Sequence, residues 1–180
     1  MPGANLSDTI ASQRQVLARD PDDITALLTL GVALCRAGAA AEALPHLTRA
    51  EELAPRMPEA KRALAEGLLL TGRRDEAIAL LLAAVEIAPD RPILLMRSSR
   101  LLIEAERHGE ALPLLQRLAE MPGAPPDAMV LLAQCYERCQ RQEEAVATLE
   151  RIAAQRPEDP VAQFNLGKAL ARQQRHDEAL

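Results

Sequence analysis

Cysteine and histidine are the residues of this chain most able to do chemistry, because their side chains bind metals and act as nucleophiles or bases. The candidates are Cys35, Cys135 and Cys139, together with His46, His108 and His176. Cys135 and Cys139 are four residues apart on one expected helix, but no histidine or third cysteine is near them in sequence. We therefore expect the cysteines to be small apolar fillers, the histidines to be surface residues, and the chain to bind no metal.

Motifs of known catalytic sites are also missing from the sequence. It contains no GxSxG, no HExxH and no glycine-rich phosphate loop, and its histidines are not paired with a nucleophile or carboxylate. We expect that the chain is not an enzyme and that it needs no cofactor.

Composition limits the partners. Of 180 residues, 48% are hydrophobic and 26% charged, and the formal net charge is −5, which disfavours nucleic-acid binding. The opening MPGANLSDTIASQRQ is not a secretory signal, and no apolar run is long enough to span a membrane. We expect a cytoplasmic protein without nucleic-acid or membrane partners. Because aromatic residues make up only 1%, its core must be aliphatic.

The elements that position these residues recur every 34 residues along the chain. Glutamate precedes alanine in five copies, and a small residue and a proline recur in the same register. The alanines are Ala43, Ala77, Ala111, Ala145 and Ala179; the small residues are Gly31, Ala65, Ser99, Ala133 and Gly167; the prolines are Pro21, Pro55, Pro89 and Pro157. Columns of different chemistry in one register indicate a structural repeat.

The copy from Pro58 to Arg91 shows what each repeat folds into. Leu64 and Leu68 have helical spacing, and the pattern then breaks at Gly72, a residue suited to the left-handed position after a helix. Asp75 and Glu76 favour the start of a second helix, which Pro89 ends. Each repeat is therefore expected to be a pair of antiparallel helices, whose close crossing requires the small residues.

This pattern resembles the tetratricopeptide repeat family, which implies an all-α, right-handed α-solenoid of helix pairs. We expect an amino-terminal capping half-repeat over residues 1–21, with a helix from Asp8 to Arg19. Full repeats follow at residues 24–57, 58–91, 92–125 and 126–159, and a partial repeat covers residues 160–180.

The third repeat, residues 92–125, is irregular. Ser98 replaces a leucine of the pattern and should weaken the core if its hydroxyl lacks a partner, although a helix-capping or back-bonded serine is the favoured interpretation over a hinge. Glu106 occupies the place of the turn glycine. Pro45 and Pro113 are expected in the first turns of their helices, where proline costs least.

In the resembled family, the first helices of successive repeats line a concave groove that binds a peptide or helix of a partner protein. Places two, five, nine, twelve and thirteen of each repeat face that groove. Carried over, the resemblance implies a partner-binding surface that includes Leu28, Val32, Arg62, Glu66, Met96, Arg100, Gln134, Arg138, Phe164, Lys168 and Arg172. Apolar members such as Leu28 and Phe164 are candidate anchors, and the alternative is that they pack on neighbouring repeats.

Known family members hold carboxylates of chaperone peptides with a lysine and asparagine clamp, but Leu28 and Val32 occupy the equivalent places here. That activity is therefore not expected. A looser hypothesis is that Arg100, Arg138, Lys168 and Arg172 attract an acidic segment. A related helical-hairpin family reads RNA, but the acidic composition disfavours it.

Two functions follow from the resemblance. The first is a non-catalytic scaffold for protein interactions; the alternative is the docking arm of a larger bacterial enzyme, such as a sulfotransferase, glycosyltransferase or hydroxylase, with its catalytic domain beyond Leu180. The alanine, arginine and leucine content is typical of a GC-rich bacterial genome. Because the partial repeat stops within HDEAL, we expect a longer protein, or self-association through the open carboxy-terminal end.

Overall fold

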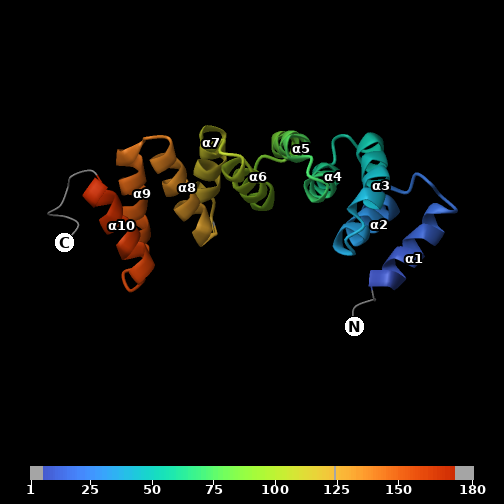
Figure 1. Cartoon of the computed structure of the whole chain (residues 1–180), viewed down its shortest axis with the longest axis horizontal. Helices are drawn as coiled ribbons and strands as arrows, with labels where there is room; N and C mark the ends of the chain where they lie inside the picture. Colours follow the sequence, from blue (N-terminus) through green and yellow to red (C-terminus); the bar gives the residue numbers. More distant parts are fainter. Residues whose placement is uncertain (1–5, 124, 173–180) are drawn as a thin grey trace. The chain divides into compact units, whose positions relative to one another are not determined.

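The computed structural model describes residues 6–123 and 125–172. This part of the chain folds into helices alone, which Figure 1 shows in chain order. They are α1 (Leu6–Leu17), α2 (Ile24–Arg36), α3 (Ala40–Leu53), α4 (Pro58–Leu70), α5 (Arg74–Ile87), α6 (Pro92–Glu104), α7 (His108–Glu120), α8 (Pro126–Arg138), α9 (Gln142–Gln155) and α10 (Pro160–Arg172). The all-α prediction is confirmed, and α1 begins and ends two residues earlier than the expected span from Asp8 to Arg19. None of the described helices is long and apolar enough to cross a membrane.

The chain divides into two compact units, residues 1–94 and residues 95–180. In the first unit each helix from α1 to α5 packs on the next, and α2 also packs on α4. In the second unit α7 packs on α8, α8 on α9 and α9 on α10. Each unit is thus built from consecutive antiparallel helices whose contacts are local in sequence.

The core of each unit is aliphatic, as the composition predicts. Leu30, Leu47 and Ile78 are almost completely buried in the first unit, and Leu102 and Leu115 in the second. The two aromatic residues behave differently: Tyr136 is buried, whereas Phe164 is 69% exposed.

Glycine and proline punctuate the helices. The backbone of Gly72 has a φ of +80°, which confirms the left-handed turn expected there. Glu106 and Gln140 stand at equivalent turns and also have positive φ, 60° in both, although each carries a side chain. Pro45 and Pro113 were wrongly expected in first turns: α3 and α7 begin five residues before them, at Ala40 and His108, so each proline lies in the second turn.

The two serines of α6 are both buried but differ in hydrogen bonding. The Ser99 hydroxyl donates to the Leu95 carbonyl at 2.8 Å, whereas the Ser98 hydroxyl has no partner among the described residues. The favoured interpretation of Ser98 as back-bonded is therefore wrong and applies to its neighbour. A buried hydroxyl without a partner carries its full desolvation cost.

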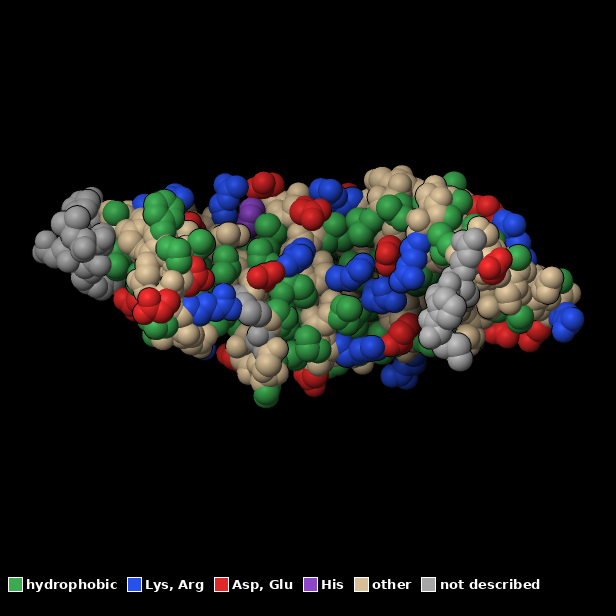
Figure 2. Space-filling view, turned by 90° about the horizontal axis from the view of Figure 1, so that it is seen from below, with side chains coloured by type: hydrophobic (Ala, Val, Ile, Leu, Met, Phe, Trp, Pro, Cys, Tyr) green, Lys and Arg blue, Asp and Glu red, His purple; other side chains and the backbone are tan. Residues whose placement is uncertain are grey.

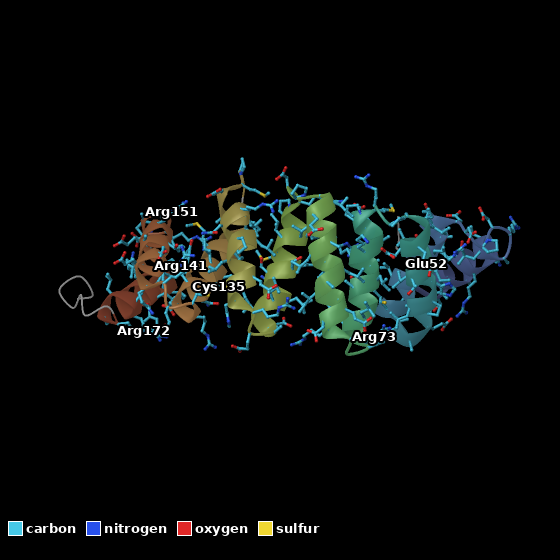
Figure 3. All side chains as sticks on the ribbon, turned by 90° about the horizontal axis from the view of Figure 1, so that it is seen from above. Glu52, Arg73, Cys135, Arg141, Arg151 and Arg172 are labelled. Carbon is cyan, nitrogen blue, oxygen red and sulfur yellow. The ribbon has the colours of Figure 1, made fainter. Side chains whose placement is uncertain are left out.

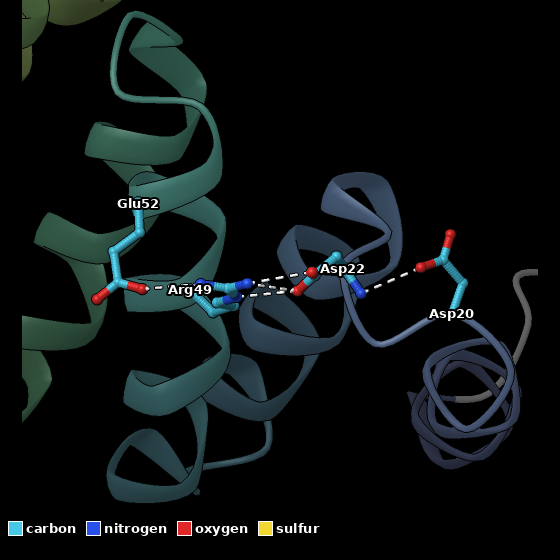
Figure 4. Close-up of polar contacts among 4 residues, drawn as sticks. All are labelled: Asp20, Asp22, Arg49 and Glu52. Atoms are coloured by element: carbon cyan, nitrogen blue, oxygen red, sulfur yellow. Dashed lines mark hydrogen bonds and ion pairs between the residues drawn. The ribbon is translucent and has the colours of Figure 1, made fainter.

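Ion pairs fix the turn between α1 and α2 against α3 (Figure 4). The Arg49 guanidinium donates to both carboxylate oxygens of Asp22, at 2.9 Å and 3.1 Å, and to Glu52 at 3.4 Å. The Asp22 amide in turn donates to the Asp20 carboxylate at 3.2 Å. The hydrogen bond to Asp22 raises the pKa of Arg49.

Candidate functional site

The predicted partner-binding residues all lie on first helices of repeats, and the structure buries none of them. Those of the first unit and of the start of α6 are half-buried: Leu28, Val32, Arg62, Glu66 and Met96. Those further along are exposed: Arg100, Gln134, Arg138, Phe164, Lys168 and Arg172. Figure 2 shows one face of the molecule, on which basic, acidic and hydrophobic side chains lie close together.

The Val32 pocket lies between α1 and α2 in the first unit and has a volume of about 380 Å³. Its lining consists of Leu6, Thr9, Leu28, Thr29, Val32, Ala33 and Arg36. It brings together the predicted residues Leu28 and Val32 with an arginine at the last position of α2. None of its described lining residues is acidic.

Ion pairs cover the surface of α4 in the first unit and leave little open space there. Arg62 and Glu66 pair at 3.4 Å on α4, and Glu59 pairs with Arg91. The hydrogen bond from Arg91 lowers the pKa of Glu59. The space that Glu59, Arg62 and Arg91 line together with Ile93 is about 10 Å³, which is too small for a ligand side chain.

Two pockets share Val130 in the second unit. The Ile103 pocket, about 300 Å³, lies between α6 and α8 and is lined by Arg100, Ile103, Glu104, Asp127, Val130 and Leu131. The Asn165 pocket, about 110 Å³, involves α8 and α10 and is lined by Val130, Ala133, Gln134, Glu137, Leu149, Asn165 and Lys168. Because one side chain lines both, the two pockets are adjacent across α8.

The four basic residues predicted to bind a partner in the second unit differ in whether a carboxylate pairs with them. Arg100 donates to Asp127 at 3.0 Å, and Arg172, labelled at the end of α10 in Figure 3, donates to Glu137 at 2.9 Å. Arg138 and Lys168 have no charged partner among the residues that the structure describes. The hypothesis that all four attract an acidic segment stays a prediction, in which Arg100 and Arg172 would have to exchange carboxylates of neighbouring repeats for those of the segment.

Residues at place six of the repeats were missed by the sequence analysis. Thr29, Leu131 and Asn165 occupy this place in three repeats, and each lines a pocket. The signal was present in the sequence, since place six lies one helical turn from places two and nine, which were included.

The cysteines and histidines form no metal centre in the described part of the chain. All three cysteines are free, and Cys35 and Cys135 are buried, in agreement with their expected role as apolar fillers. Burial raises the pKa of Cys135, labelled in Figure 3, to about 11, so its thiol stays protonated at neutral pH. The half-buried His108 ring lies 3.1 Å from the Glu106 carbonyl, and His176 is outside the described residues.

Comparisons with solved structures agree with this architecture. YrrB, described as a TPR protein with an unusual peptide-binding site, aligns with a TM-score of 0.80 at 19% identity, over 95% of this chain and 88% of YrrB. MamA from Desulfovibrio magneticus RS-1 aligns with a TM-score of 0.67 at 19% identity, over 97% and 91%. A tetratricopeptide repeat protein from Parabacteroides merdae gives 0.72 at 16% identity, over 97% and 69%. At these identities the likeness is one of fold.

Sequence models of a repeat family cover the chain more specifically, whereas no curated protein matches it. One model described as tetratricopeptide repeat matches residues 36–96 and again residues 102–163. Two others of the same description match residues 10–58 and 160–180. These matches account for most of the chain and agree with its helix pairs, so the protein is an all-α solenoid that belongs to the tetratricopeptide repeat family.

Proposed function

We propose that the chain is a non-catalytic scaffold for protein interactions that binds a peptide or helix segment of a partner across α8 of the second unit. The observation that carries this proposal is the adjacency of the Ile103 and Asn165 pockets, which share Val130. Adjacent pockets fit successive side chains of one bound segment better than they fit a single small molecule.

The two pockets differ in chemistry and so select different parts of that segment. In the Ile103 pocket, Ile103, Val130 and Leu131 are half-buried and supply an apolar lining. The exposed Glu104 and the Arg100–Asp127 ion pair line the rest of it. An apolar side chain of the partner would be desolvated there without displacing a charge. Burial of such a side chain contributes about 1.5–3 kcal/mol.

The Asn165 pocket is polar. The amides of Gln134 and Asn165 can donate and accept hydrogen bonds, which suits a peptide backbone, and the Lys168 ammonium lacks a charged partner among the described side chains. Phe164 lies one residue before Asn165 on α10 and offers a large exposed ring. Aromatic side chains of this kind often carry much of the energy of a protein interface. Among the residues that the structure describes, neither pocket is lined by histidine, cysteine or serine, which favours binding over catalysis.

Selection of binders from a library of random, phage-displayed peptides tests the proposal. Val130→Gln changes the side chain shared by the two pockets and should weaken selected peptides about tenfold or more, and Ile103→Gln should reduce the preference for an apolar residue. Ala147→Gln is the matched control, because Ala147 is exposed on α9 and lines neither pocket. Circular dichroism would check folding. Peptides that bind Val130→Gln and Ile103→Gln as tightly as the unchanged protein would refute this site.

A further inference from the structure

The Val32 pocket differs from the pockets of the second unit in its charge. Among the described lining residues, Arg36 is the single ionisable one, whereas the Ile103 pocket contains two carboxylates and the Asn165 pocket contains one. We propose that the Val32 pocket is a second interaction site, which binds an acidic segment of a partner protein. In this arrangement an aliphatic side chain of the segment enters the pocket, and a neighbouring carboxylate pairs with Arg36.

The apolar part of the pocket can accept such a side chain. Leu6 of α1 faces the same space as Leu28 and Val32 of α2, and all three are half-buried, so they retain surface that a ligand would cover. The volume of about 380 Å³ falls within the range of roughly 300–1,000 Å³ that is usual for ligand pockets.

Arg36 is available for a ligand, in contrast to other arginines at equivalent surfaces. It is exposed and has no partner among the described residues, while Arg62, Arg100 and Arg172 pair with Glu66, Asp127 and Glu137. An uncompensated guanidinium beside an apolar pocket favours a carboxylate, with which arginine forms paired hydrogen bonds.

The end of α2 does not need Arg36 as a cap. The amides of Ala37, Gly38 and Ala39 donate to carbonyls of the last helical turns, at 3.0 Å, 3.1 Å and 2.9 Å. These bonds satisfy the carbonyl groups at the end of the helix, to which a lysine or arginine side chain could otherwise donate. The Arg36 side chain is therefore left to interact with something outside the helix.

The two threonines supply further polar groups. The Thr29 hydroxyl donates to the Thr25 carbonyl at 2.7 Å, which leaves its lone pairs able to accept from a peptide N–H. Thr9, on the opposite wall of the pocket, also presents a hydroxyl. An extended segment would therefore meet three kinds of group on this small surface: apolar side chains, threonine hydroxyls that can accept from its backbone N–H groups, and one cation.

This site is independent of the one proposed on α8, because it lies in the other unit and shares no residue with it. The test uses the same library of random, phage-displayed peptides with the whole chain, selecting on the unchanged protein and on Arg36→Glu. We expect one group of selected peptides to contain an aliphatic residue next to aspartate or glutamate. This group should be lost with Arg36→Glu and kept with Val130→Gln.

Binding constants of one such peptide provide the quantitative check. Arg36→Gln should weaken it about 10- to 100-fold, the loss expected for a charge-assisted hydrogen bond, and replacing its acidic residue by the matching amide should have a similar effect. Arg56→Gln is the matched control, since Arg56 is exposed outside the helices of the first unit and has no partner among the described side chains. Selection that yields no acidic group, or an acidic peptide insensitive to Arg36→Gln, would overturn the proposal.

Discussion

Replacing Gly31 by alanine should destabilise the protein although alanine is the better helix former. A β-carbon built at Gly31 would lie 2.4 Å from Cδ2 and 2.5 Å from Cγ of Leu47. Carbon atoms pack favourably at about 3.5–4.0 Å, so the leucine would have to move by about an ångström. Leu47 has no exposed surface, and its Cδ1 is also only 3.1 Å from the place of a β-carbon at Gly67. Two glycines of α2 and α4 thus form the slot that holds this leucine of α3.

The sign of the effect follows from two opposing terms. Alanine gains about 1 kcal/mol over glycine in a helix interior. Overpacking a closed core costs about 1–3 kcal/mol, and the very short contacts put Gly31 at the upper end. We expect a net loss of about 1–2 kcal/mol for Gly31→Ala. At Gly67, where the nearest side-chain atoms are 3.1 Å and 3.2 Å away, the two terms should nearly cancel.

Urea denaturation followed by circular dichroism measures these differences. Gly109→Ala is the control, because a β-carbon there meets nothing within 4 Å and the substitution should stabilise the first turn of α7 slightly. Leu47→Ala should cost less in the Gly31→Ala background than in the unchanged protein, since the smaller side chain removes the clash. A Gly31→Ala protein that is as stable as the unchanged one would show that α2 and α3 separate easily and that the slot is not rigid.

Other consequences of the structure can be measured in the same way. Glu106→Gly and Gln140→Gly should each stabilise the protein, by about 1 kcal/mol or less after the entropic cost of glycine, because both positions have φ of 60°; an unchanged urea midpoint would argue against strain at these turns. Ser98→Ala should stabilise by about 1–3 kcal/mol, since it removes a buried hydroxyl without a partner, and destabilisation would indicate that the hydroxyl finds one. The pKa of Cys135 is raised from 9.0 to about 11 in the folded state, so the unfolded chain releases this proton at lower pH than the folded protein does. The protonated thiol therefore contributes to stability in full below about pH 9, and this contribution is lost as the pH rises towards 11. Cys135→Ala should remove that part of the pH dependence, and in the native protein iodoacetamide should modify the half-buried Cys139 before Cys135.

The fold could be predicted from the sequence because it depends on residues that recur. A left-handed backbone follows the first helices at Gly72 and, with side chains in place of glycine, at Glu106 and Gln140. Ala65 and Ala77 are small where two helices cross, and the structure buries both alanines completely. Such requirements are imposed by the backbone and are the same in each repeat. A repeat period of 34 residues therefore carries enough information to place the helices.

The state of individual polar groups could not be predicted in this way. Ser98 and Ser99 are adjacent in sequence and both buried, yet only Ser99 reaches a carbonyl one turn back, because hydroxyl rotation and neighbouring packing decide the hydrogen bond. The partners of Arg100 and Arg172 lie 27 and 35 residues away in sequence. Long side chains on adjacent helices can meet several neighbours, so the pairing depends on rotamers that periodicity does not specify.

The same reasoning explains why the binding surface differs from repeat to repeat on an almost constant backbone. Place nine holds Val32, Glu66, Arg100, Gln134 and Lys168 in the five successive repeats. At this one place, the valine lines an apolar pocket, the glutamate and the arginine form ion pairs with neighbouring side chains, and the glutamine and the lysine line a polar pocket. A residue that must recur is explained by packing, whereas a residue free to vary at an exposed place is available for recognition. Specificity in this protein should therefore be sought where the repeats disagree, and place nine, where Val32 lines an apolar pocket beside Arg36, is such a place.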